Sequence, residues 1–402
     1  MTEALEGTQH TDDSADLLPL RERVAAAVEA ARTHAEDVDA EGRFPAEAVA
    51  ALKQHRLLAP EPVPGQGLWT APQVVAVAHA LGQACASTAM IWAMHQGQIQ
   101  AVARQPKTSD PVREFLDSAW ETQPLVASLM SETGAASPRE SRAHCREDPD
   151  GSGGIVIDKN VSVSSYLQHA DAGLLVARRS ADDAVTEGAL VLVHRDELVI
   201  TQWRDWQALG MRGTGSGGGR VRARTHPDRI LEESFSEASA RVIMPLSNLG
   251  WAACWLGIAE SAFATAQDAF RRQQSRTAPD VLTARTMRLG RASDTIDELT
   301  EQIHSLAGRY EELRGTASDT MVRRSNALRL TAAARANESV LDSFQVIGVD
   351  AYREPTASKW SLSRQIRDVL SARVMISEDR IRLGSGQLAQ LPRRSSLQDA
   401  IG

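Results

Sequence analysis

The sequence has few of the residues on which several protein classes depend. Its 402 residues hold three cysteines, Cys85, Cys145 and Cys254, with no metal-like spacing, so a disulfide framework and a cysteine metal site are both excluded. Lys and Arg number 44 against 52 Asp and Glu, a formal net charge of −8, and no basic tract stands out. A nucleic-acid partner is therefore not expected, and a reduced, intracellular setting fits.

Long apolar runs are also missing. No run approaches the roughly 18 residues that a membrane span requires, and residues 1–16 are acidic and polar, unlike a secretory or transit leader. We therefore expect a cytoplasmic protein with no membrane partner and a disordered N-terminus over residues 1–16. Aromatic residues make up only 4% of the chain while alanine is abundant, which favours closely packed helices.

The common catalytic signatures are absent too. The chain has no P-loop, no nucleophile elbow and no metal-binding histidine pair, and we expect no resident metal. Segment 213–218 formally satisfies the G-x-G-x-x-G dinucleotide fingerprint, but an alternating Arg/Val strand pattern follows it where the fingerprint needs a helix. We interpret its glycines as a turn, and His95, on an apolar helix, as a packed wall residue.

What is present is an order of helices, strands and helices. Helical periodicity dominates residues 17–123, short β-type runs separated by Gly, Asp and Ser occupy 124–243, and helical signals fill 244–402. We expect strands over residues 125–130, 155–159, 174–177, 190–194, 199–203 and 220–224, and helices from residue 20, over 45–52, 70–92 and 321–344, and from 362 to about 382.

The clearest periodic signal is one long seam in the third part of the chain. Its apolar members follow alternating steps of three and four residues. They are Leu289, Ala292, Ile296, Leu299, Ile303, Leu306, Tyr310 and Leu313. Such a seam packs against partner helices at a shallow angle, as in a four-helix bundle. The predicted fold is mostly α: an N-terminal helical domain, a central antiparallel β-sheet or barrel, and a C-terminal four-helix bundle.

Three short hydroxyl-rich segments leave or enter apparent strands, at residues 129–137, 159–171 and 209–216. Any one of their serines is best explained as an ordinary turn hydroxyl. Gathered together, however, hydroxyl and backbone N–H groups on short loops suit a planar, polar-edged cofactor. The sequence therefore predicts a flavoenzyme.

The order of motifs from Phe44-Pro-Ala-Glu-Ala-Val, through these three loops, to Arg364-Gln-Ile-Arg367-Asp368 resembles the acyl-CoA dehydrogenase superfamily over nearly the whole chain. The resemblance implies non-covalently bound FAD between the β-domain and the four-helix bundle. It also implies a homodimer or homotetramer. The family loop T-E-P-G-A-G-S-D matches Ser131-Glu-Thr-Gly-Ala-Ala-Ser-Pro138, and the family W-I-T segment falls on Val163, Ser164 and Ser165.

The same resemblance assigns the cofactor-binding residues. The first loop places flavin contacts at Ser128, Met130, Ser131, Ala136 and Ser137, and the second at Val163, Ser164 and Ser165. The family's Q-x-H-G-G turn, which reaches the FAD of a neighbouring subunit, is represented by Gln345 and Gly348 without its histidine and second glycine.

Departures from the family pattern concern the catalytic base. Family dehydrogenases use the Glu of an E-G-T turn about eight residues after the R-D pair, where this chain has Ile376. Glu378 lies two residues further and is the candidate base, although a shift of two residues turns a helical side chain through roughly 200°. Glu260 and Asp268 are the alternatives. The R-x-x-F-G motif that grips the partner's pyrophosphate is missing, with Arg271 and Arg272 its nearest substitutes.

Three functions stay open at this point. The first is α,β-dehydrogenation of an acyl thioester carried by CoA or an acyl carrier protein, with electrons leaving through an electron-transfer flavoprotein. The second is a two-component monooxygenase that receives reduced flavin from a flavin reductase and uses O2, which needs no carboxylate at the α-carbon. The third is a non-catalytic homologue, which the retained hydroxyls make the weakest.

Overall fold

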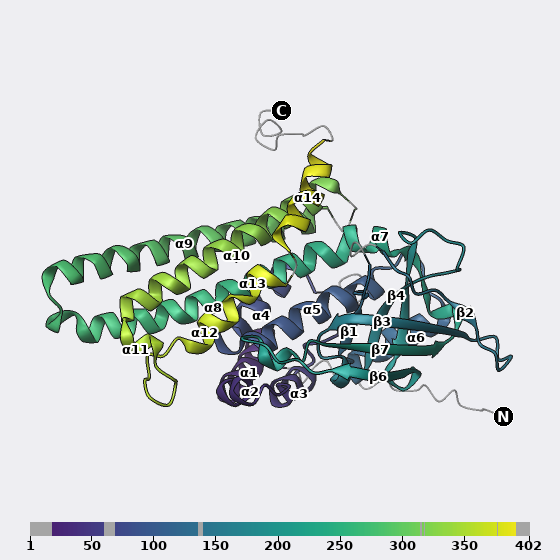
Figure 1. Cartoon of the computed structure of the whole chain (residues 1–402), viewed down its shortest axis with the longest axis horizontal. Coiled ribbons are helices and arrows are strands. Elements are labelled where there is room, and N and C mark those ends of the chain that lie inside the picture. The colour runs from purple at the N-terminus through teal and green to yellow at the C-terminus, as the bar shows by residue number, and fades with distance from the viewer. Residues whose placement is uncertain are drawn as a thin grey trace, which may run out of the picture.

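The computed structural model describes residues 18–59, 69–135, 140–313, 316, 318–375 and 377–390. The segment expected to be disordered, residues 1–16, lies outside them. Along the described chain, helices come first, strands second and a long helical bundle last. In Figure 1 the strands occupy one end of the molecule, and the long helices α8, α9 and α10 run side by side away from them.

Six helices form the N-terminal part. They are α1 (Leu20–Thr33), α2 (Ala35–Glu41), α3 (Ala46–Gln54), α4 (Ala71–Ala84), α5 (Ala86–Ala103) and α6 (Asp110–Thr122). The expectation of one helix over residues 70–92 was wrong, because Cys85 adopts an extended conformation (φ −144°, ψ 108°) that separates α4 from α5. The Arg364 Nη1 group donates to the Ala84 carbonyl at this break (3.2 Å), so the interrupted helix end has a partner.

The strands form two sheets of four. They are β1 (Val126–Leu129), β2 (Arg146–Glu147), β3 (Ile155–Ser164), β4 (Ala172–Arg178), β5 (Gly188–His194), β6 (Leu198–Arg204), β7 (Gly217–Thr225) and β8 (Ile230–Ser234). One sheet has the order β1-β4-β5-β8 and the other β2-β3-β7-β6. Where the sequence predicts an antiparallel sheet or barrel, the strands form two separate sheets, and β1 pairs with β4 in parallel.

The glycines of segment 213–218 lead into a strand rather than a helix. β7 begins at Gly217 and pairs with β3 and β6. Its arginines point outward while Val221 and Ala223 are buried, the alternation of a strand with one solvated face. A dinucleotide-binding turn is therefore absent at this position.

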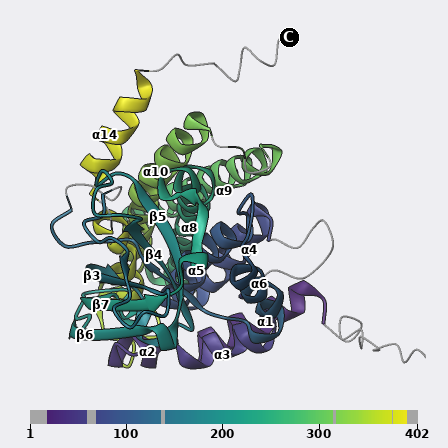
Figure 2. The same ribbon diagram turned by 90° about the vertical axis from the view of Figure 1, so that its right-hand side faces the viewer.

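Helices make up the chain from Phe235 onward. They are α7 (Phe235–Ala238), a π-helical turn (Ser239–Ile243), α8 (Met244–Gln273), α9 (Pro279–Glu312), α10 (Asp319–Ile347), α11 (Val349–Tyr352), α12 (Ser363–Val369), α13 (Ser371–Val374) and α14 (Glu378–Ala389). The last strand, β8, ends at Ser234, and the first helix after it begins at Phe235, whereas the domain boundary predicted from the sequence lies at residue 243. The expected continuous helix over 362–382 is three short helices, and Figure 2 shows the last of them, α14, standing away from the body.

The seam predicted on α9 is the packed face of that helix. Six of its members, from Ala292 to Tyr310, are buried, while Leu289 and Leu313 are partly buried. The continuous helical segment Phe235–Gln273 is long and apolar enough to cross a membrane, but its most apolar window is 94% buried inside the protein. That burial is typical of the core helix of a bundle.

His95 joins the helical domain to the first strand. Its Nε2 lies 2.7 Å from the Leu58 carbonyl, and its Nδ1 accepts from the Val126 N–H at 3.0 Å. A carbonyl only accepts and an N–H only donates, so the ring must be neutral with its proton on Nε2. Burial lowers the pKa of His95 to about 4. The expectation of a packed wall residue is met.

His95 should therefore make the fold acid-sensitive. In the unfolded chain its pKa is about 6.5, so the stability tied to the neutral ring is complete above pH 6.5 and is lost as pH falls through 4. Between pH 7 and 4.5 the free energy of unfolding should fall by about 2 kcal/mol because of this group. Urea unfolding of His95→Gln, whose amide can make both hydrogen bonds without titrating, should lack this fall. His226→Gln, at an exposed site, should keep it; identical pH slopes in all three proteins would contradict the assignment.

Candidate functional site

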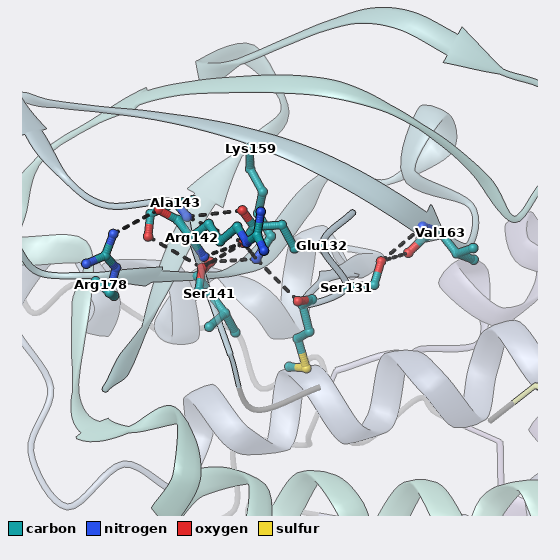
Figure 3. Close-up of polar contacts among 10 residues, drawn as sticks. Ser131, Glu132, Ser141, Arg142, Ala143, Lys159, Val163 and Arg178 are labelled. Carbon is teal, nitrogen blue, oxygen red and sulfur yellow. Dashed lines mark hydrogen bonds and ion pairs between the residues drawn. The ribbon is translucent and has the colours of Figure 1, made fainter. Parts of the chain in front are cut away.

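The first two predicted loops are joined by a serine. Ser131 follows β1, and its Oγ both donates to the Val163 carbonyl (2.5 Å) and accepts from the Val163 N–H (3.0 Å) at the end of β3 (Figure 3). Beside this pair, Ser164 Oγ donates to the Ser128 carbonyl at 2.7 Å. Ser128, Ser131, Val163 and Ser164 therefore lie together, and their contact with a flavin stays a prediction.

The third loop joins the same cluster through hydroxyl groups. Ser165 and Ser216 lie 2.7 Å apart, as do Ser216 and Thr214, and Thr214 donates to the Met211 carbonyl at 2.8 Å. The Tyr166 N–H donates to the Thr214 carbonyl at 2.8 Å, which holds the second and third loops in register. Three segments far apart in sequence therefore form one hydroxyl-rich cluster, in which Ser164, Thr214 and Ser216 are buried.

A buried ion pair supports the first loop. Lys159 on β3 donates from Nζ to the Val176 carbonyl (2.7 Å) and the Met130 carbonyl (3.2 Å), and lies 3.6 Å from a carboxylate oxygen of Glu132 (Figure 3). Burial lowers the pKa of Lys159 to about 8, and Glu132 opposes that shift. The Glu132 carboxylate also accepts from Ser141 Oγ and from the N–H groups of the next two residues, so the pair joins the end of β1 to residues 141–143.

A carboxylate from the C-terminal part of the chain holds the third loop. Asp368 on α12 is 3% exposed, and its Oδ1 accepts from the Met211 N–H at 2.6 Å. Burial raises the pKa of Asp368 to about 6, opposed by the nearby Arg364 guanidinium. The approach is so close that a side chain at Gly210 would collide with the Arg367 carbonyl, so only glycine fits there. Arg367 itself pairs with Asp39 and donates to the Leu209 carbonyl at 3.0 Å.

The exposed edge of this hydroxyl-rich cluster suits a flavin ring. Val163 is 48% exposed, and the neighbouring Met130, Ser131 and Ser165 are half-buried. An apolar patch with hydroxyl and backbone groups at its margin matches a flat ring system with polar edges. The chemistry of the donors therefore fits the ring, and these residues would hold it. The predicted contacts Ala136 and Ser137 lie outside the described residues.

The other predicted residues lie elsewhere. Gln345 and Gly348 are at the far end of α10 beside α11, at the opposite end of the molecule from the strands, so within one chain they are remote from the serines (Figure 1). Glu378 begins α14, where it pairs with Arg373 (2.8 Å) and Arg382 (3.5 Å). These arginines hold the pKa of the Glu378 carboxyl below its usual range.

Both alternative bases are also engaged. Glu260 lies 2.9 Å from His79 Nε2 and accepts from the Gln83 amide, and these partners lower its pKa against the opposing effect of burial. Asp268 accepts from the Trp360 indole (3.0 Å) and from Arg272 (2.8 Å). Arg272, one of the two substitutes for the missing phosphate-binding motif, is thereby occupied.

Part of the chain matches a known protein family, and the whole fold matches solved structures. Residues 14–106 match the model of the acyl-CoA dehydrogenase N-terminal domain. No curated protein matches the sequence. The dibenzothiophene monooxygenase TdsC from Paenibacillus sp. A11-2 is a structural neighbour with TM-score 0.73 and 19% identity, covering 91% of this chain and 96% of that one.

Two further solved structures match over similar lengths. KijD3, in complex with FMN and a dTDP-linked amino keto sugar, has TM-score 0.76 and 20% identity, with 94% of each chain covered. Butyryl-CoA dehydrogenase from Megasphaera elsdenii has TM-score 0.77 and 13% identity, covering 92% of this chain and 98% of that one. The chain therefore has an acyl-CoA dehydrogenase-like fold, and its residues 14–106 match the N-terminal domain of that family. Its order of helical domain, β-domain and bundle is the arrangement expected of a superfamily member.

Several residues that build the candidate site were not assigned from the sequence. Thr214 and Ser216 lay in a segment that was singled out, but neither was assigned a contact. The Lys159–Glu132 pair gave no sequence signal, because the two residues lie on different segments. Asp368 was quoted only as part of a motif, and nothing in the sequence shows that it accepts from Met211.

Asp368 offers a test of how the third loop is held. In Asp368→Ala the backbone N–H of Met211, a residue that is 3% exposed, loses its acceptor. The free energy of unfolding should therefore fall by about 1–3 kcal/mol. Hydrogen exchange at residues 209–216 should accelerate. Asp368→Asn keeps an acceptor oxygen and serves as the matched control, which should retain slow exchange. Equal exchange in both variants would show that the loop does not depend on this bond.

Proposed function

We propose that this protein is a reduced-flavin-dependent monooxygenase of the acyl-CoA dehydrogenase superfamily, supplied with reduced flavin by a separate reductase. The observation that carries the proposal is the state of its carboxylates. Glu378, Glu260 and Asp268 each form an ion pair or a set of hydrogen bonds, and each has a lowered pKa. Dehydrogenation of a thioester needs an available carboxylate at the α-carbon.

Glu378, the base predicted from the sequence, is poorly suited to that role. A carboxylate whose pKa is lowered by two arginines is a weaker proton acceptor, because taking up a proton would break both ion pairs. Oxygenation places no such demand, since the reduced cofactor supplies electrons to O2. The residues of this chain would then position and shield the ring rather than remove a proton from carbon.

Ser131, Ser164 and Ser165 have defined roles in this proposal. Ser131 and Ser164 use their hydroxyls to hold neighbouring backbone, so they act by fixing the shape of the ring's seat. Ser165 belongs to a hydroxyl chain with Ser216 and Thr214, whose protons can reorient to suit a polar edge. Val163 would cover the ring and exclude water. The structural neighbours TdsC, a monooxygenase, and KijD3, bound to FMN, support this proposal.

We further propose FMN rather than the FAD predicted from the sequence. Gln345, one of the two remote FAD contacts that the family resemblance implies, borders a groove of about 460 Å³ between α9 and α10. Three arginines line that groove with three carboxylates, and they are paired: Arg288 and Arg291 with Asp342, and Arg335 with Glu338. A pyrophosphate there would face Asp342 and would have to displace existing ion pairs.

Cofactor choice can be measured directly. Fluorescence titration of purified protein should give FMN a dissociation constant at least ~10-fold lower than that of FAD. Ser165→Ala should weaken FMN binding by about 3- to 10-fold, the effect of one hydrogen bond, while Ser236→Ala, an exposed hydroxyl on α7, should change nothing. Tighter binding of FAD than of FMN would reject the FMN assignment.

The reaction type needs a separate test. With FMN bound, butyryl-CoA should not bleach the flavin in the absence of oxygen, whereas reduced FMN should support oxygen consumption. Glu378→Gln should leave oxygen consumption unchanged, because its charge is not used. Anaerobic bleaching by butyryl-CoA, abolished by Glu378→Gln, would establish thioester dehydrogenation and overturn the proposal.

Assembly belongs to the same proposal. Large apolar side chains lie exposed at the free end and along the outer side of the bundle, including Val349, Tyr352, Val374 and Leu383, all at least 66% exposed. A homodimer or homotetramer formed through the bundle would cover them. A cytoplasmic location, where a flavin reductase would supply the cofactor, is part of this proposal.

A further inference from the structure

Arg329 is the most unusual charged residue in the bundle. It lies on α10 facing α8, is 1% exposed, and is among the largest fully buried side chains of the described residues. Its guanidinium carbon is 4.6 Å from the ring centroid of Trp251 and 6.0 Å from that of Trp255. The charge is therefore enclosed by aromatic rings.

No acceptor meets this guanidinium. Neither Nη1 nor Nη2 has a hydrogen-bond partner within the described residues, and Arg329 is in no ion pair there. Burial, the sole cause of its shift, lowers the pKa of Arg329 to about 10, so the group remains a cation at neutral pH. The indole N–H groups of Trp251 and Trp255 are buried without acceptors as well.

This set of groups lacks an anion. Arginine is almost never buried without a carboxylate, phosphate or carbonyl to receive its fixed fork of N–H groups. A cation–π contact compensates only part of the cost of removing the charge from water. Four buried donor atoms on three adjacent side chains have no partner among the described residues, so the missing component is an acceptor, and a negatively charged one neutralises the guanidinium too.

The location of Arg329 connects it with the proposed site. Trp251 lies in the early part of α8, one turn after Ser247, which contacts α5: a Cβ built at Gly97 of α5 would be 2.6 Å from Ser247 Oγ. α5 in turn holds β1, which leads to the first hydroxyl-rich loop, through His95. Arg329 therefore lies at the packing junction of the bundle with the helix that supports the candidate site.

We propose that Arg329, between Trp251 and Trp255, is the receptor for the carboxylate of a small organic substrate. The planar fork of Arg329 would bind both carboxylate oxygens, and the indole rings would supply apolar walls for the organic part. That the ligand is a substrate rests on the proposed flavin-dependent function; the binding itself does not. The occupant is an organic carboxylate, and inorganic anions are the competing occupants in the test.

The first experiment is thermal unfolding of flavin-free protein with sodium benzoate as the probe, at constant ionic strength. Benzoate should raise the Tm of the wild type by about 2 °C or more, and phosphate or chloride should raise it less. In Arg329→Gln the benzoate shift should vanish, and in Arg329→Lys, which keeps the charge but not the fork, it should shrink. Arg323→Gln, a partly exposed arginine on the same helix, should behave as the wild type.

The second measurement separates a receptor from a structural arginine. Without ligand, Arg329→Gln should have a Tm equal to or higher than the wild type, because it removes an uncompensated buried charge. A lower Tm together with an undiminished benzoate shift would overturn the proposal. Equal stabilisation by benzoate, phosphate and chloride would show an adventitious ion only, and would overturn it as well.

A measurement of FMN affinity distinguishes failure of the carboxylate site from failure of the proposed function. Arg329 contacts none of the three hydroxyl-rich loops in the described structure, so Arg329→Gln should bind FMN with wild-type affinity while losing the benzoate response. If neither protein bound flavin but the benzoate shift still required Arg329, the proposed function would fall and the carboxylate site would stand.

Discussion

The hydrogen bond between the Met211 N–H and the buried carboxylate of Asp368 is the constraint on which the candidate site depends. It fixes the loop that presents Thr214 and Ser216, and through them the hydroxyl of Ser165. Asp368 belongs to the last part of the bundle, whereas the other four belong to the β-domain. The hydroxyl-rich cluster therefore takes its observed shape only when the β-domain and the last part of the bundle are packed together.

Three buried charged groups near this docking region differ in how they are compensated. Lys159 has the Glu132 carboxylate and two carbonyls, and Asp368 has the Met211 N–H with the Arg364 guanidinium nearby. Burial nevertheless moves the pKa of Lys159 to about 8 and that of Asp368 to about 6, which shows that desolvation outweighs these partners. Arg329 has aromatic rings alone. The two paired charges organise the loops, whereas Arg329, which has no charged partner among the described residues, is the group for which we propose a ligand.

Local patterns predicted the helix–sheet–helix order, the α9 seam and the first two serine loops, since each depends on periodicity or turn chemistry within a few residues. Long-range contacts were not predictable in this way. The Arg364 group at the Ala84 carbonyl allows the helix break at Cys85, and the parallel pairing of β1 with β4 joins strands separated by more than 40 residues of chain. Asp368 shows the same limit, because its partner lies 157 residues away.

The broken final helix connects fold to chemistry. Ser371 Oγ donates to the Asp368 carbonyl at 2.5 Å, a side-chain bond that competes with the helical ladder near the end of α12. α13 then ends at Val374 and α14 starts at Glu378, so the chain does not continue as one helix through the segment where the superfamily dehydrogenases carry their base. Glu378 is instead paired with Arg373 and Arg382. The break in the helix and the pairing of Glu378 have one structural origin, and the proposed oxygen chemistry rests on both, because that reaction class needs no free carboxylate in this segment.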